Sequence, residues 1–163
     1  MDVKPVADIT LDPLSEADAP ALFAFEVQNR AWFEHWVGPR PDTYWELSSL
    51  TRIIRDQVAE GEAMFLIKRQ GEILGRLNIT GEGDSVAQLG YRVGEAYVGQ
   101  GVASAAVILG LEQARKRGLW ALEARVLDDN PASMHVLEKC GFHPTGQKEM
   151  GGRVFSSYRR DLD

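Results

Sequence analysis

The sequence lacks the features that mark secreted and membrane-spanning proteins. Cys140 is the only cysteine among the 163 residues, so the chain cannot form an internal disulfide. No apolar run approaches the roughly 20 residues that a membrane-spanning helix requires. Residues 1–10 lack the basic and apolar blocks of a signal peptide. These absences predict a cytoplasmic protein with no membrane partner.

Positive charge is also scarce. The chain carries 18 Lys and Arg residues against 24 Asp and Glu residues, a formal net charge of −6 at pH 7. Basic residues are therefore not in excess to neutralise a phosphate backbone, which excludes nucleic acid as an expected partner. The three histidines, His35, His135 and His143, follow no metal-ligand spacing, so we expect no metal site.

The residues that are present are typical of one compact domain over residues 1–163. Hydrophobic residues make up 44% of the chain and charged residues 26%, which is enough apolar material for one buried core. Apolar periodicity and turn residues predict helices over residues 15–28, 31–37, 42–60, 99–117 and 131–139. They predict strands over residues 9–13, 63–68, 72–80, 86–93, 119–126 and 153–160.

The order of these elements predicts an α+β fold. Residues 63–93 form an antiparallel meander, whereas the later strands alternate with helices. Such alternation requires crossover connections and at least one parallel pair of strands. We therefore expect a central mixed, mostly antiparallel, twisted sheet of about six to seven strands flanked by helices.

A glycine-rich turn over residues 97–104 joins the strand at 86–93 to the next helix. Glycines allow positive φ and leave no Cβ in the way, so N–H groups at the helix start can converge on a phosphate. The same turn could also serve without a ligand. A dinucleotide loop is a further alternative, because Gly99, Gly101 and Ser104 nearly fit the GxGxxG pattern. Glu123 lies near the expected downstream position of its acidic residue.

Two features weaken the dinucleotide interpretation. In that motif the first glycine directly follows its strand, whereas residues 94–98 separate Val93 from Gly99 here. Only about 60 residues follow Gly101, which is too few for the larger parallel sheet of such domains. A P-loop is excluded because no GxxxxGK sequence followed by Ser or Thr occurs.

Four segments, in order and in register, resemble one known family. They are Leu89-Gly90-Tyr91-Arg92-Val93, Val98-Gly99-Gln100-Gly101-Val102-Ala103, Asn130-Pro131-Ala132-Ser133 and Glu138-Lys139-Cys140-Gly141-Phe142. Together they resemble the GNAT superfamily of acetyl-CoA-dependent N-acetyltransferases. Within it, the chain is most similar to the Rim branch of ribosomal-protein N-terminal acetyltransferases, over nearly its whole length. The resemblance implies a single GNAT-like domain whose sheet splays at the cofactor site.

The resemblance also implies which residues bind acetyl-CoA. The turn that holds the pyrophosphate through its amides matches Val98, Gly99, Gln100, Gly101, Val102, Ala103 and Ser104. The pantetheine arm would lie in the splay and bond backbone groups of Tyr91, Arg92 and Val93. Asn130 would bond the pantetheine through its side chain and could also cap the helix that follows it. Family members often have Arg or Gln in place of Val98, so one side-chain contact with the pyrophosphate would be missing here.

The departing thiolate needs a proton donor. Many family members have a tyrosine where this chain has Leu137. In the Rim branch a serine matching Ser133 is the implied donor, because its hydroxyl could hydrogen-bond the sulfur and supply the proton. Loss of the usual tyrosine leaves a second hypothesis open, a non-catalytic sensor module that binds acyl-CoA.

Direct attack of a primary amine on the thioester also needs a neutral nitrogen. An aliphatic amine with a pKa of about 10 is mostly protonated at pH 7, whereas a protein N-terminus, at about 8, needs a weaker base. The sequence distinguishes no single base. Glu123, on the strand after the cofactor helix, is the catalytic candidate, and Glu26, Glu34, Glu72 and Glu82 are alternatives.

The acceptor, a small molecule or a protein N-terminus, is expected to meet an aromatic helix. Trp32 and Trp36 stand four residues apart on one helix face, and Phe33 lies beside them, so these three form the predicted substrate-binding wall. Positions in the core are an equal alternative for them. We expect Cys140 to be a buried apolar residue rather than a nucleophile. A homodimer is left open.

Overall fold

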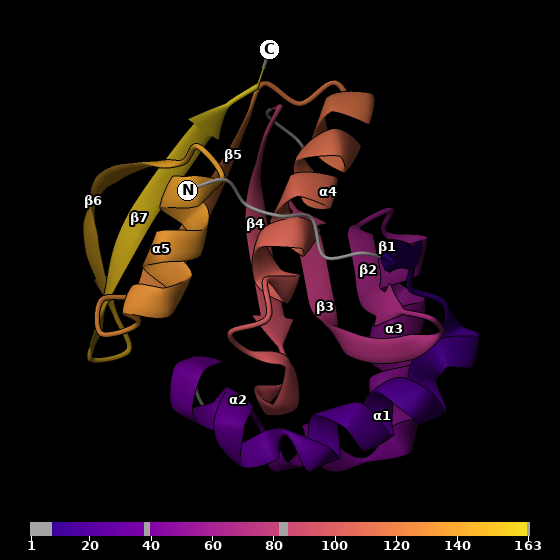
Figure 1. The fold of residues 1–163 in the computed structure, drawn as a ribbon. Helices are drawn as coiled ribbons and strands as arrows, with labels where there is room; N and C mark the ends of the chain where they lie inside the picture. The colour runs from indigo at the N-terminus through magenta and orange to yellow at the C-terminus, as the bar shows by residue number, and fades with distance from the viewer. Residues whose placement is uncertain (1–7, 38–39, 82–84, 163) are drawn as a thin grey trace.

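The computed structural model of the protein describes residues 8–37, 40–81 and 85–162 (Figure 1). Its centre is a seven-stranded sheet in the order β1-β2-β3-β4-β5-β7-β6. The strands are β1 (Ile9–Pro13), β2 (Ala63–Arg69), β3 (Glu72–Thr80), β4 (Val86–Val93), β5 (Ala121–Leu127), β6 (His143–Met150) and β7 (Arg153–Asp161). Strands β4 and β5 are parallel, and the other neighbours are antiparallel. The predicted mixed, mostly antiparallel sheet is confirmed.

Helices flank the sheet on both faces. The α-helices of the described residues are α1 (Ala19–Gln28), α2 (Arg30–Val37), α3 (Leu47–Ala59), α4 (Val102–Lys116) and α5 (Pro131–Lys139). Short 3-10 turns, η1 (Glu16–Asp18), η2 (Asp42–Trp45) and η4 (Glu95–Tyr97), precede α1, α3 and the glycine turn. Helix α4 connects β4 to its parallel neighbour β5. Within these ranges no helix is both long and apolar enough to cross a bilayer.

Two apolar clusters hold the sheet between its helices. One cluster joins the sheet to α4 and α5 and includes Leu77, Leu122 and Leu137. The other packs β2 against α1 and α3 and includes Leu22 and Leu66. Figure 1 shows α4 lying along the sheet, with α1 and α2 below its lower edge. Strands β2 and β3 therefore have one face toward α4 and the other toward α1 and α3.

The sheet divides between β4 and β5. These strands pair from Val86 with Ala121 to Gln88 with Glu123. Beyond that point β4 continues beside β3 as far as Val93, and β5 continues beside β7. In Figure 1, β4 and the β5–β7 pair run apart toward the lower part of the molecule. We call this divergence, which begins at Gln88 and Glu123, the fork; it confirms the expected splay.

The clearest differences from the sequence prediction concern α4, α3 and β6. Helix α4 begins at Val102 rather than at residue 99, because Gly99 and Gly101 have positive φ that a right-handed helix cannot contain. The predicted helix at 42–60 divides into η2 and α3, since Glu46 is extended, with φ of −123° and ψ of 131°. Strand β6 is absent from the predicted strands. All of its residues are exposed, so they show no apolar alternation.

Candidate active site

The glycine turn presents backbone groups to solvent. Gly99 and Gly101 have φ of +76° and +80°, and a Cβ at either position would meet no atom within 4 Å. Gly101 caps α4, and Ala105 N donates to Gly101 O at 3.1 Å. The N–H groups of residues 102–104 precede that bond and have no acceptor within the helix. With the positive end of the helix dipole behind them, these groups form a cradle suited to a phosphate.

The side chains of the turn take little part in this cradle. Val102 and Ser104 are buried beneath it. Gln100 Nε2 donates to Ala96 O at 3.2 Å. Val98 is exposed and apolar. The main chain is therefore what the turn offers to an anion.

Beyond the start of the fork, the backbone N–H and C=O groups of β4 point alternately toward β3 and toward the gap between β4 and β5. Gly94 N donates to Leu74 O at 2.8 Å, on the β3 side. Because bonding alternates along an antiparallel strand, the backbone groups of Tyr91 and Val93 point away from β3. The Val93 carbonyl accepts the indole N–H of Trp32 at 3.2 Å. The N–H groups of Tyr91 and Val93 thus line the gap between β4 and β5.

Ser133 lies in the first turn of α5 and faces the phenol of Tyr91. Asn130 is the N-cap of α5, and its Oδ1 accepts the Ser133 N–H at 3.2 Å. Ser133 Oγ lies 2.8 Å from the Tyr91 hydroxyl oxygen. Burial raises the pKa of Tyr91 to about 12, and the hydrogen bond with Ser133 acts in the opposite direction. The phenol is therefore neutral near pH 7 and can donate to Ser133.

This side-chain contact is missing from the sequence prediction, which places Tyr91 at the site through its main chain. Part of the signal is present in the sequence. Tyr91 alternates with Leu89 and Val93, which marks it as facing the α4 side of the sheet. Its partner Ser133 stands 42 residues away, so the pairing depends on how α5 packs.

Glu123 lies at the fork on the other face of the sheet. It pairs in register with Gln88, at the last position before the strands diverge, and Gln88 Nε2 donates to Glu123 Oε1 at 3.4 Å. Leu122 and Ala124 face the core beneath α4, so Glu123 faces the opposite side. A groove of about 300 Å³ adjoins it, lined by residues of β4, β5, β6 and β7. Ser133 and Glu123 thus lie on opposite faces of the sheet at the fork.

Comparison with known proteins assigns the chain to a family. Residues 8–143 match the model of the acetyltransferase (GNAT) domain. The chain belongs to the GNAT acetyltransferase family. YjcK of Bacillus subtilis (strain 168), a probable N-acetyltransferase, is 28% identical over 148 residues, which cover 85% of this GNAT chain and 82% of that protein.

Two solved structures share the fold of this GNAT domain. RimJ of Mycobacterium smegmatis, in complex with CoA-disulfide, has a TM-score of 0.81 and 26% identity, covering 94% of this chain and 81% of that one. RimL, a ribosomal L7/L12 α-N-protein acetyltransferase in complex with coenzyme A, has a TM-score of 0.87 and 22% identity. That match covers 99% of this chain and 98% of the other. The chain is an acetyl-CoA-dependent N-acetyltransferase, as its motifs predict.

The geometry of this GNAT domain fits acetyl-CoA. Open space above Gly99 and Gly101, next to the free helix amides, accommodates a pyrophosphate. The gap at the fork offers the N–H groups of Tyr91 and Val93 to an extended amide-bearing chain such as pantetheine. Asn130 Oδ1 is used in capping α5, which leaves the two N–H donors of its amide for a ligand.

The other carboxylates considered as bases in this GNAT enzyme are paired or lie away from the fork. Glu26 is buried in contact with two arginines. Glu34 forms a surface ion pair within α2. Glu72 accepts a hydrogen bond from η4, and Glu82 lies outside the described residues. Of the candidates with a described position, Glu123 is the one at the fork.

The three aromatic residues expected at the acceptor site divide between core and fork. Phe33 is buried, and its ring centroid lies 5.8 Å from that of Phe25. Trp36 packs edge-on against Trp32, with ring centroids 5.9 Å apart. Trp32 in turn bonds the Val93 carbonyl. Phe33 therefore belongs to the core, whereas Trp32 contacts the main chain of β4 at the fork.

Leu137 and Cys140, at the end of α5, are both core residues. Leu137 is fully buried and carries no proton to donate. Cys140 is buried as predicted, with Sγ 3.8 Å from Ser104 O. Burial raises the pKa of the Cys140 thiol. A thiol that keeps its proton is a poor nucleophile, which fits the structural role expected of Cys140.

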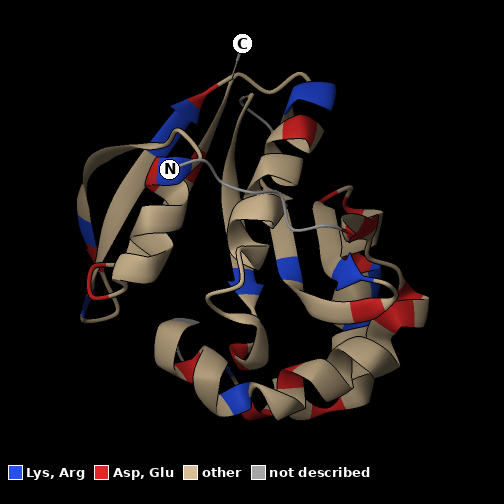
Figure 2. Cartoon of the chain, in the orientation of Figure 1, with Lys and Arg blue, Asp and Glu red and all other residues tan. Residues whose placement is uncertain are grey.

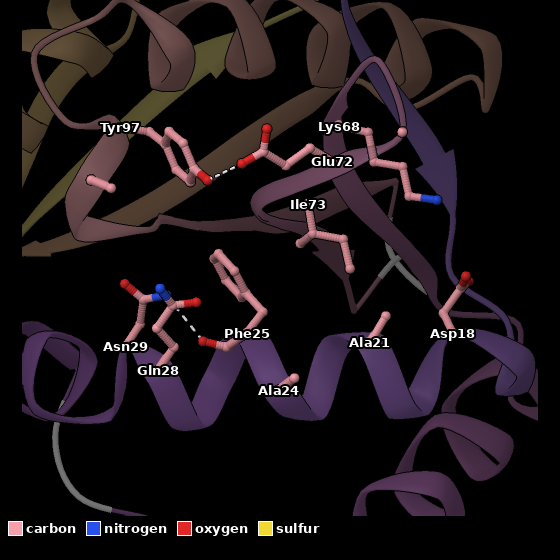
Figure 3. A pocket seen from close by; sticks show the side chains of 12 residues that line it. Asp18, Ala21, Ala24, Phe25, Gln28, Asn29, Lys68, Glu72, Ile73 and Tyr97 are labelled. Atoms are coloured by element: carbon pink, nitrogen blue, oxygen red, sulfur yellow. Dashed lines mark hydrogen bonds between the residues drawn. The ribbon is translucent and has the colours of Figure 1, made fainter.

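A second hollow, of about 420 Å³, lies between α1, the β2–β3 turn and η4 (Figure 3). Phe25 and Ile73 contribute apolar walls, and the Tyr97 hydroxyl donates to Glu72 across it. Its described lining includes none of the residues that meet at the fork. The two hollows are therefore separate features of the domain.

Proposed function

We propose that this GNAT enzyme acetylates the α-amine of a protein or peptide N-terminus at the fork. The placement of Ser133 and Glu123 on opposite faces of the sheet supports this proposal. An amine that approaches from the Glu123 face meets a carboxylate, and a sulfur that leaves toward α5 meets a hydroxyl.

An N-terminal α-amine suits this arrangement better than a side-chain ammonium. With a pKa of about 8, roughly one α-amine in ten is neutral at pH 7, against roughly one aliphatic amine in a thousand. Glu123 is partly exposed and accepts a hydrogen bond from Gln88, and an α-amine demands less of the base than a side-chain ammonium does. The activity for which RimL is named, α-N-protein acetylation, supports the same class of acceptor.

The chain's own groups account for the proton transfers. Acetyl-CoA supplies an acetyl group activated as a thioester, whose C–S bond breaks as the new C–N bond forms. Glu123, directly or through one water molecule, accepts the proton that the amine loses. Ser133 Oγ supplies a proton to the departing sulfur, and the Tyr91 hydroxyl orients Ser133. One of the strand N–H groups that line the gap, that of Tyr91 or of Val93, stabilises negative charge on the acetyl oxygen, and the other is left for the pantetheine.

The proposal is tested by following free thiol released from acetyl-CoA. The acceptors are peptides with free N-termini, the same peptides with blocked N-termini, and small primary amines. We expect release with the free peptides and none with the blocked ones. Thiol release with the small amines alone would show that the acceptor is a small molecule and not a protein or peptide N-terminus. Tight CoA binding without release above the hydrolysis blank would favour the non-catalytic acyl-CoA sensor.

A further inference from the structure

A buried cluster of charged side chains lies where α1 and η2 pack on β3 and β4. Glu26 is 1% exposed, and its Oε1 accepts from Arg92 Nη2 at 2.7 Å and from Arg76 Nη1 at 3.5 Å. The Arg40 guanidinium stacks 4.2 Å from the ring centroid of Tyr44. The Tyr44 hydroxyl accepts from Arg92 at 3.4 Å. We call Glu26, Arg40, Arg76 and Arg92 the arginine cluster.

The arginine cluster carries an excess of positive charge. Burial lowers the pKa of Arg40 and of Arg76, and the neighbouring charge of Arg92 lowers both further. The negative charge of Glu26 acts in the opposite direction on both arginines and raises their pKa. Arginine keeps its proton at physiological pH. Three positive charges are therefore held against one negative charge, and burial of unpaired charge is costly.

Hydrogen-bonding capacity in the arginine cluster is also unused. Arg76 Nε and Glu26 Oε2 are buried and have no partner among the residues that the structure describes. The Arg76 side chain is only 7% exposed, so bulk water does not readily satisfy its donor. A ligand with negatively charged oxygens would supply the missing negative charge and the kind of acceptor that Arg76 Nε lacks, although not the donor that Glu26 Oε2 lacks.

The arginine cluster borders the fork on the face where Glu123 lies. Arg92 stands between Tyr91 and Val93 in β4, and alternation turns its side chain away from the Tyr91 face. Arg76 is its register partner in β3. Figure 2 shows a basic segment of β3 beside a basic segment of β4. The cluster is thus one strand position from the main-chain groups that line the fork.

We propose that Arg40 and Arg92 of this cluster bind a carboxylate that the acceptor carries close to its amine. The inference rests on the proposed acetyl transfer at the fork. A carboxylate matches the planar donor geometry of guanidinium groups, and Arg40 is partly exposed. Two sources supply this chemistry: an Asp or Glu side chain that follows the N-terminal residue of a peptide, and the carboxylate of a small amino acid.

The test uses pairs of ligands that have nearly the same shape and differ in whether they carry a carboxylate. Calorimetry on the CoA-saturated protein compares Ser-Asp amide with Ser-Asn amide, and β-alanine with its amide. We expect the carboxylate member of at least one pair to bind roughly tenfold more tightly, as for a charge-assisted hydrogen bond. The preference should weaken as salt concentration rises. Measurement of kcat/KM with acetyl-CoA then uses the same four compounds.

Arg40→Gln is the test variant, because the ion pairs of Glu26 are made to Arg76 and Arg92 and stay intact. Arg30→Gln is the matched control, since Arg30 also stacks on an aromatic ring, 4.3 Å from the centroid of Trp45. We expect Arg40→Gln to bring the two probes of a pair within about twofold of each other, as expected once the charge-assisted bond is lost. Arg30→Gln should keep the preference. Arg40→Lys, which keeps the charge, should retain part of it and decides the matter if Arg40→Gln fails to fold.

The outcomes distinguish this inference from the proposed function. Equal binding of both members of each pair overturns the inference, even when thiol release shows an active enzyme. An unchanged preference in Arg40→Gln overturns it as well. A carboxylate preference without any thiol release supports the anion site and contradicts the acetyl transfer. Preference within the peptide pair alone identifies an acidic N-terminal sequence, and preference within the β-alanine pair alone identifies a small amino acid.

Discussion

The hydroxyls of Tyr91 and Ser133 lie 2.8 Å apart between β4 and α5, and only one of them can donate in that hydrogen bond; the Tyr91 hydroxyl also lies 3.4 Å from Ser133 O. If Tyr91 donates to Ser133 Oγ, the Ser133 proton is left free for another acceptor. Burial holds the pKa of Tyr91 at about 12, so the phenol remains a donor across the neutral range. We therefore treat Tyr91 as a positioning residue for Ser133. Ser133 is the proposed proton donor because Leu137, at the position of the usual tyrosine, has no proton to donate.

Substitution Ser133→Ala tests the proton donor. We expect kcat to fall by about tenfold or more, the order of effect seen when a general acid is lost. The KM for acetyl-CoA should change little, because the cradle at the glycine turn is untouched. Steady-state thiol release measures both constants. Tyr91→Phe, which keeps the serine but not its partner, should lower kcat less; an unchanged kcat in Ser133→Ala removes Ser133 from the mechanism.

The buried phenol of Tyr91 also predicts a pH dependence of stability. Its pKa is about 12 in the folded protein and about 10 in an unfolded chain. The raised pKa stabilises the fold fully below pH 10, and this contribution is lost as pH rises from about 10 to about 12. The free energy of unfolding should fall by on the order of 2 kcal/mol across that range.

Urea unfolding at several pH values measures this change. Tyr91→Phe has no group to titrate at that position, so its stability should decline less over the same pH range. The wild type should therefore lose stability relative to the variant as pH rises. Parallel curves for the two proteins would show that Tyr91 ionises as easily in the fold as in the unfolded chain.

At the scale of elements, Gly101 at the start of α4 determines how the first amides of the helix are directed toward a ligand. Gly101→Ala places a Cβ on a residue with φ of +80°, a conformation that costs an L residue about 1 kcal/mol or more. The relief of that strain would turn the amides of residues 102–104 away from their shared direction. We expect weaker CoA binding by about tenfold, since several charge-assisted bonds depend on that alignment, measured by calorimetry.

Gly118→Ala is the control for this effect. Gly118 follows the other end of α4, has φ of +72°, and likewise has open space around its Cβ position. It should lose a similar amount of stability and bind CoA as the wild type does. Equal losses of CoA affinity in the two variants would mean that strain in α4, rather than the amide cradle, controls binding.

Elements with local signals could be predicted, and those without them could not. Helix α5 has the predicted bounds, because Asn130 caps it and Gly141 follows it within the same short segment. Strand β6 has no apolar alternation, since it pairs at the edge of the sheet with every side chain exposed. The glycine turn was predictable for the same local reason as α5. The contact of Tyr91 with Ser133 was not, because it depends on packing between distant segments.

At the scale of the whole molecule, the fork divides the sheet into two parts. Strands β1 to β4 form one part, and β5 to β7 form the other. Pairing between the two parts extends only from Val86 and Ala121 to Gln88 and Glu123. The core beneath α4 joins them elsewhere. A ligand that lies in the fork therefore adds contacts where the sheet has no hydrogen bonds of its own.

CoA should therefore stabilise the whole domain and protect the fork in particular. A ligand that binds only the folded state raises the free energy of unfolding by about 2.7 kcal/mol at 100 times its Kd. We expect CoA to raise the Tm, and NAD to leave it unchanged. Hydrogen exchange should slow at the amides of Tyr91, Val93 and residues 102–104, and stay unchanged in the solvent-facing edge strand β6.

The pattern of protection carries more weight than the rise in Tm, because any tight ligand raises Tm. Slower exchange at residues 102–104 without a change at Tyr91 and Val93 would place the pyrophosphate in the cradle and exclude the pantetheine from the fork. The acetyl group would then lie away from Ser133 and Glu123, and the proposed transfer would fail. A Tm that rises with NAD and not with CoA would contradict the assignment of the glycine turn itself.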